Sequence, residues 1–164
     1  MPALAAIDLE AFLVWGLVAT TAMSAILEGA RRMHWSRMSL PFLFGTAVTG
    51  RSRLASLLGF GLYVVGGWVF AFLYAWLFEV VGFAGIWLGM AIGVLHGVWL
   101  LVVFLPLLAE VHPRMATART GLTRTRRLEP PGLAGLNYGA RTPLITLVGQ
   151  AVYGAILGFG YGLG

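Results

Sequence analysis

The chain has 164 residues, of which 59% are hydrophobic and 10% are charged, a far more apolar balance than that of a soluble domain. The formal net charge is +5 and every basic residue is arginine, which in so apolar a chain indicates loops lying against anionic lipid and no binding to nucleic acid. Cysteine and lysine are both absent, which excludes disulfides, thiolate metal sites, cysteine nucleophiles and Schiff-base chemistry.

Four apolar runs are long enough to cross a hydrocarbon core, and the first covers about residues 11–30. Thr20, Ser24 and Glu28 repeat at every fourth position along it and form a polar stripe. Such a stripe must face protein, because hydroxyl and carboxylate groups need partners inside a bilayer. Together with Gln150 of the last run, it predicts a polar seam between the first and fourth spans.

An arginine-rich connection follows at 31–56 and begins with Arg31 and Arg32. Residues 38–44 are apolar but too short to span, and Pro41 interrupts them. We expect this segment to lie in the headgroup region, with a turn at 45–50. The second span is then predicted at about 57–81.

The third span, at about 86–109, contains the most regular pattern in the chain. Glycine recurs there at every fourth position, which places all of these glycines on one helix face and lets another backbone approach closely. This ladder consists of Gly85, Gly89, Gly93 and Gly97. It predicts that the third span forms the centre of the bundle, and Pro106 predicts a kink near its end.

A second arginine-rich loop is predicted at 110–142, with little regular structure because it is rich in glycine, proline and polar residues. Its arginines include Arg124, Arg126 and Arg127. With Arg31 and Arg32 they are candidates for binding anionic lipid headgroups or a partner. The last span, at about 143–163, carries a second glycine ladder at Gly154, Gly158 and Gly162.

The distribution of charge predicts the topology. Every arginine lies between the first and second spans or between the third and fourth, whereas the opposite side holds only Asp8, Glu10 and Glu79. By the positive-inside rule both arginine-rich loops are cytoplasmic and both termini are outside. We therefore expect one all-α transmembrane domain over residues 1–164, a polytopic four-helix bundle with glycine-ladder packing in a bacterial inner membrane.

Several short motifs support this assignment through a resemblance. They are Gly16-Leu-Val-Ala-Thr-Thr-Ala-Met23, Leu40-Pro-Phe-Leu-Phe-Gly-Thr46, His96-Gly97, His112-Pro-Arg-Met115, Leu128-Glu-Pro-Pro-Gly132 and Leu136-Asn-Tyr-Gly139. With these motifs the chain resembles a group of bacterial four-helix membrane proteins that have no assigned activity. The resemblance covers most of the chain and implies the topology, but it carries no catalytic residue across.

Two groups of residues are candidates for binding a ligand. His96 lies deep in an apolar span, where it is a candidate ligand for a haem or a chlorophyll-type ring, with the glycines giving the ring room. The favoured alternative is a histidine hydrogen-bonded to a neighbouring helix, for instance to Thr20. A juxtamembrane set of histidines and glutamates suits zinc or iron in principle, but pairing of the glutamates with arginines is favoured. This set is Glu28, His34, Glu110 and His112.

No catalytic constellation is present, because the single aspartate, Asp8, lies near the N-terminus and no serine has an adjacent base. We therefore expect an accessory or scaffold subunit without catalytic activity, joined to other membrane subunits or to itself. The glycine ladders support this, since two of them exceed what one intramolecular contact needs. The alternatives are a small-solute or ion transporter that uses the polar seam, and a pigment-binding subunit that uses His96.

Overall fold

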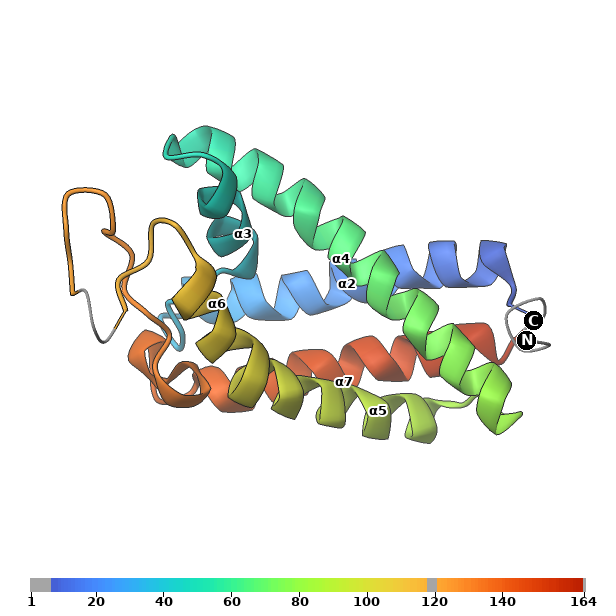
Figure 1. The fold of residues 1–164 in the computed structure, drawn as a ribbon. Coiled ribbons are helices and arrows are strands. Elements are labelled where there is room, and N and C mark those ends of the chain that lie inside the picture. The colour runs from blue at the N-terminus through green and yellow to red at the C-terminus, as the bar shows by residue number, and fades with distance from the viewer. Residues whose placement is uncertain (1–6, 118–120, 164) are drawn as a thin grey trace. The chain divides into compact units, whose positions relative to one another are not determined.

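The computed structural model describes residues 7–117 and 121–163. Residues 1–6, 118–120 and 164 lie outside the described part, and they include Arg119 of the second arginine-rich loop. The described residues are helical apart from turns, irregular connections and one isolated β-bridge between Met115 and Leu128. The elements are α2 (Leu9–Arg32), α3 (Leu40–Val48), α4 (Ser52–Val81), α5 (Ile86–Trp99), the π-helical turn η1 (Leu100–Phe104), α6 (Leu105–Val111), the 3-10 helix η2 (Leu133–Tyr138) and α7 (Thr142–Tyr161) (Figure 1).

Four helical stretches among the described residues are long and apolar enough to cross a membrane. They are Leu9–Arg32, Ser52–Val81, Ile86–Val111 and Thr142–Tyr161, each with at least the roughly 20 residues that a hydrocarbon core requires. This confirms the predicted all-α class with four membrane spans. The second span begins at Ser52, earlier than the apolar run at Leu57 suggested, because the helix continues through the polar residues that precede the run.

The chain divides into two compact units, and α2, α4, α5 and α7 contribute residues to both. The first, called here the bundle unit, comprises Met1–Ile26, Val64–Gly97 and Leu147–Gly164. The second, called the loop unit, comprises Leu27–Tyr63 and Val98–Thr146. All eleven arginines of the sequence fall in the loop unit.

Within the bundle unit, segments of α2, α4, α5 and α7 pack as a four-helix bundle. Gly16 of α2 lies against Trp68 and Ala71 of α4, and the indole N–H of Trp68 donates to the Leu13 carbonyl at 3.0 Å. The Tyr153 hydroxyl of α7 donates to the Gly67 carbonyl of α4 at 2.6 Å. In these contacts a large aromatic side chain of one helix packs against a small residue of its neighbour.

The closest contact in the bundle unit joins the two glycine ladders, and α5 and α7 run side by side there (Figure 1). A Cβ atom at Gly89 would overlap the Gly154 carbonyl, and one at Gly93 would overlap the Gln150 carbonyl. The reverse also holds, since a Cβ at Gly158 would overlap the Gly85 carbonyl. The two ladders therefore face each other, backbone against backbone, as small-residue packing in membranes requires.

The prediction that the third span forms the centre of the bundle was wrong. In α5 only Gly89, Gly93 and Gly97 are buried, and Trp87 on its outer face is 80% exposed. In contrast, α7 buries Tyr153 and Leu157 almost completely. The glycine face of α5 is the face that contacts α7. Of these two helices, α7 is the more buried and lies closer to the centre of the bundle unit.

In the loop unit, α3 packs against the first turns of α4 (Figure 1). A Cβ at Gly45 would overlap the Ala55 carbonyl, and one at Gly59 would overlap the Pro41 carbonyl. The expected turn at 45–50 was wrong, because α3 continues to Val48 and uses Gly45 for this contact. Pro41 does not interrupt the helix but starts it, since a proline in the first helical turn needs no N–H acceptor.

Pro106 is accommodated by a change of helix type. The five residues before α6 form the π-helical turn η1, whose end is marked by a bond from the Leu105 N–H to the Leu100 carbonyl. A proline cannot donate a hydrogen bond, and a π-turn rearranges the local hydrogen bonding around such a gap. The helical path consequently continues to Val111.

The second arginine-rich loop is more ordered than expected. Tyr138 in η2 is buried, and its hydroxyl donates to the Glu129 carbonyl at 2.8 Å. Burial raises the pKa of Tyr138 to about 12, with a smaller contribution from the nearby Glu129. Arg37 forms an ion pair with Glu129 at 3.1 Å, which joins the first loop to the second.

Candidate functional site

His96 lies in an aromatic cluster of the bundle unit. Its ring stacks on Phe70 with ring centroids 4.0 Å apart, and its Nδ1 lies 3.4 Å from the Tyr74 hydroxyl. The ring of Tyr153 approaches it edge-on at 6.4 Å. Thr20 was the wrong choice of partner, because its side chain packs against Gly67 and its hydroxyl has no hydrogen-bond partner among the described residues.

The glycines beside His96 do not provide room for a flat ring. The backbone of α7 fills the face of the α5 ladder at Gly89 and Gly93, while the side chains of Leu147 and Gln150 contact Gly97. Phe70 already covers one face of the imidazole. The reason for expecting a haem or chlorophyll-type ring at this histidine is therefore removed.

The residues of the expected polar seam differ in their surroundings. Thr20 and Gln150 are buried in the bundle unit, and the Thr20 hydroxyl and the Gln150 side-chain carbonyl have no hydrogen-bond partner within the described residues. Ser24 instead donates to the Thr20 backbone carbonyl at 2.7 Å. Glu28 belongs to the loop unit, where it is ion-paired with Arg31 at 2.7 Å and with Arg32 at 3.3 Å. The seam thus retains two buried polar groups, and its carboxylate is neutralised by arginines.

The four juxtamembrane histidines and glutamates have separate roles in the loop unit. Glu28 is ion-paired with arginines, and His34 follows α2 with φ of 58°, the left-handed conformation that commonly ends a helix. Glu110 is exposed, whereas His112 is buried. Among the residues described, no group of three or more His, Asp or Glu side chains is arranged to hold a metal ion.

His112 and Arg114, which follow α6, form hydrogen bonds that hold this end of α6 against α3. The His112 Nε2 donates to the Leu43 carbonyl at 3.0 Å, and its Nδ1 accepts the Arg114 backbone N–H at 3.1 Å. The Arg114 guanidinium then donates to the carbonyls of Thr46 and Ala47 at 2.6 and 3.1 Å. Because Nδ1 acts as an acceptor, this arrangement requires a neutral imidazole. Burial lowers the pKa of His112, the Leu43 carbonyl opposes this shift, and the Arg114 charge adds to it.

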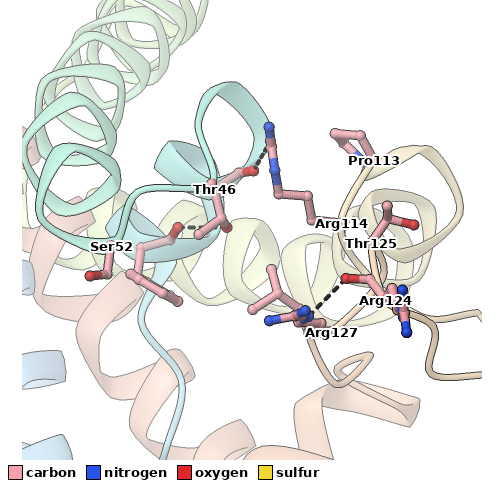
Figure 2. Close-up of a pocket in the computed structure, with 10 residues that line it drawn as sticks. Thr46, Ser52, Pro113, Arg114, Arg124, Thr125 and Arg127 are labelled. Carbon is pink, nitrogen blue, oxygen red and sulfur yellow. Dashed lines mark hydrogen bonds between the residues drawn. The ribbon is translucent and has the colours of Figure 1, made fainter.

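Beside this junction the loop unit contains a pocket of about 500 Å³ (Figure 2). Its walls come from α3, from the start of α4, from the residues that follow α6 and from the second arginine-rich loop. The lining residues are Phe42, Thr46, Gly50, Ser52, Pro113, Arg114, Arg124, Thr125, Arg127 and Leu128. Three of them are arginines and none is acidic, so the pocket is a concentrated positive site.

Sequence reasoning identified only part of this pocket. Arg124 and Arg127 were candidates for lipid or partner binding, and both line it. Arg126 is not among the lining residues, and Arg31 and Arg32 are held by Glu28. Arg114 was missed. The available signal was that Arg114 follows the third span and Ser52 precedes the second in the sequence, so the expected topology places both at the same membrane surface.

Comparisons with known proteins give no information about these sites. No family model, curated protein or solved structure matches the chain. The resemblance to bacterial four-helix membrane proteins accordingly stays a prediction.

Proposed function

We propose that the protein is a non-catalytic accessory or scaffold subunit of a bacterial inner membrane, which associates through α4 with another membrane subunit or a second copy of itself. The observation that supports this is Gly66. A Cβ atom at this position would have nothing within 4 Å. The glycine ladders no longer provide the argument, because they contact each other within the chain.

The position of Gly66 favours a helix as its partner. A glycine inside a helix costs about 1 kcal/mol relative to alanine. Gly61 of the same helix is open as well but lies on a different face of α4, and no neighbour in the chain accounts for Gly66. It starts a row of outward-facing residues spaced alternately three and four apart, the spacing at which two helices interlock. The row continues with Val69, Leu73, Trp76 and Val80, all of them exposed. A small residue in such a row gains stability only when another helix meets it.

The test is a pair of matched substitutions, Gly66→Leu and Ala91→Leu, in protein extracted with a mild detergent. Both replace a small residue on a spanning helix, and Ala91 lies on the exposed side of α5. We expect the wild-type protein to have a mass above the 17.6 kDa of one chain. Gly66→Leu should shift it toward the single chain, whereas Ala91→Leu should leave the assembly intact.

Two results would contradict the proposal. One is a wild-type protein that runs as a single chain without partner in every mild detergent and in lipid nanodiscs. The other is an assembly that Gly66→Leu leaves unchanged, since the contact would then not involve this face of α4.

Transport of a small solute or ion is the competing function, and the observation in its favour is that the oxygens of Thr20 and Gln150 have no hydrogen-bond partner in the described part of the chain. Buried polar atoms without partners are uncommon and often mark a functional position. Against transport, Thr20 packs against Gly67, and Gln150 packs against Gly93 and Gly97, so both groups lie in close helix contacts. Flux through liposomes containing the purified protein, abolished by Gln150→Leu, would establish transport in place of the scaffold function.

A further inference from the structure

We propose that the arginine-lined pocket of the loop unit binds a phosphate group. Its three arginines come from two separate stretches of chain, and no carboxylate lines it. The volume of about 500 Å³ lies within the roughly 300–1,000 Å³ typical of small-molecule sites. Guanidinium groups match the oxygens of phosphate in geometry as well as in charge.

Arg114 is held in place without losing all of its donors. Its Nη1 atom donates to the Thr46 and Ala47 carbonyls, as Figure 2 shows for Thr46. An arginine side chain has five N–H groups, so those on Nε and Nη2 remain for a ligand. Arg114 is therefore a preorganised donor.

Arg124 and Arg127 lie on a turn that is fixed at its base. Leu128 donates to the Arg114 carbonyl at 3.0 Å and accepts from the Ala116 N–H at 2.9 Å. Within the turn, the Arg127 Nε donates to the Arg124 carbonyl at 2.8 Å (Figure 2). This attachment fixes the backbone that carries Arg124 and Arg127, so part of the energetic penalty for ordering the turn falls on folding instead of on binding.

The remaining polar groups of the lining also suit an anion. Ser52 is the first residue of α4, where backbone N–H groups lack intrahelical acceptors and the helix dipole is positive. The hydroxyl of Ser52 adds a further donor at the pocket, whereas that of Thr125 shares a hydrogen bond with Thr123. Phosphate oxygens thus meet arginines on one side and a helix start on the other.

Carboxylates do not balance these arginines. Glu28 is paired with Arg31 and Arg32, and Glu129 with Arg37, while no ion pair joins Arg114, Arg124 or Arg127 to a carboxylate in the part of the chain that the structure describes. A bound anion would compensate the like charges of the three arginines that line this cavity. The pocket also lies where the second span begins and the third ends, so in a bilayer crossed by these spans it would be near the lipid phosphates.

The ligand chemistry, an anionic phosphate, has two sources: the headgroup of an anionic lipid or a soluble phosphate. The probes are inorganic phosphate added to detergent-solubilised protein at constant ionic strength, and nanodiscs of phosphatidylcholine with or without phosphatidylglycerol. The variant R124Q/R127Q removes two pocket arginines, and R51Q/R53Q removes two exposed arginines of the same unit that do not line the pocket. The thermal unfolding midpoint is measured for each protein with each probe.

We expect a probe to raise the midpoint of the wild-type protein and of R51Q/R53Q. R124Q/R127Q should need at least about ten times more of the same probe for an equal shift, the loss expected from removing hydrogen bonds to a charged group. Stabilisation by inorganic phosphate identifies a soluble ligand, and stabilisation by phosphatidylglycerol alone identifies a lipid headgroup. Absence of stabilisation by either probe, or an equal loss in R51Q/R53Q, overturns the proposal. If R124Q/R127Q does not fold, Arg124→Gln alone is used, because it retains the bond from Arg127 to the Arg124 carbonyl.

Discussion

The two units of the chain are stabilised by different interactions. In the bundle unit, glycine backbones meet at van der Waals distance and aromatic rings pack into the spaces left by small residues, with Asp8, Glu10 and Glu79 as its only charged residues. In the loop unit, arginine and histidine side chains donate to backbone carbonyls at the ends of helices. The comparison shows where each kind of interaction is effective.

The different surroundings of the interactions explain why different kinds of contact stabilise the two units. Inside a bilayer an apolar side chain gains little by leaving lipid for protein, so close packing and hydrogen bonds must hold the helices together. At the membrane surface the ends of helices leave carbonyls without partners, and a cationic donor satisfies several of them at once. Steric changes should therefore damage the bundle unit most, while changes of charge and pH should act on the loop unit.

The largest effect is expected from Gly89→Ala. The added methyl group would overlap the Gly154 carbonyl, and two backbones cannot separate without opening the whole α5–α7 contact. We expect a loss of about 2 kcal/mol or more in the free energy of unfolding, as for an overpacked core. The measurement is unfolding of the detergent-solubilised protein by increasing SDS.

Gly61→Ala is the matched control for this substitution. Gly61 also lies inside a spanning helix, but its Cβ position is open, so alanine should stabilise the protein by up to about 1 kcal/mol. Equal effects of the two substitutions would mean that the ladder contact does not hold the bundle unit together.

A smaller effect is expected from pH, through His112. Burial lowers the pKa of this group in the folded protein, whereas in the unfolded chain it titrates near 6.5. The unfolded state therefore binds more protons as the pH falls below about 6.5, and the folded state loses stability there. Above that pH the contribution of His112 is fully present.

The measurement is the thermal unfolding midpoint between pH 8 and pH 5. His112→Gln should reduce the loss of stability at low pH, and His34→Gln, which replaces an exposed histidine of the same unit, is the control. An unchanged pH dependence in His112→Gln would show that the neutral imidazole does not stabilise the junction with α3.

The smallest perturbation tests whether the arginine-rich loops and the C-terminus lie on opposite sides of the membrane. Cysteine is absent from the chain, so Thr49→Cys, Thr123→Cys and Leu163→Cys each provide a single reactive thiol with no expected change in stability. An impermeant thiol reagent applied to intact cells should label Leu163→Cys and neither of the other two. Labelling of Thr49→Cys would refute the orientation derived from the arginines.

The apolar pattern was sufficient to predict the membrane class and the four spans. A run of about 20 apolar residues has few other stable arrangements, because every backbone group in the bilayer must be bonded within a helix. The prolines and glycines that interrupt the apolar pattern were harder to interpret. Pro41 and Gly45 were expected to break structure, yet Pro41 begins α3 and Gly45 lies within it against α4.

The sequence by itself determined which residues are small, polar or charged on each span, since the helical period fixes the face that a residue occupies. Only the tertiary structure decided what each face meets. It paired the two glycine ladders with each other, placed Tyr74 beside His96, and brought Arg114 together with Arg124 and Arg127 around one pocket. These outcomes depend on contacts between residues far apart in the chain, which a local pattern does not encode.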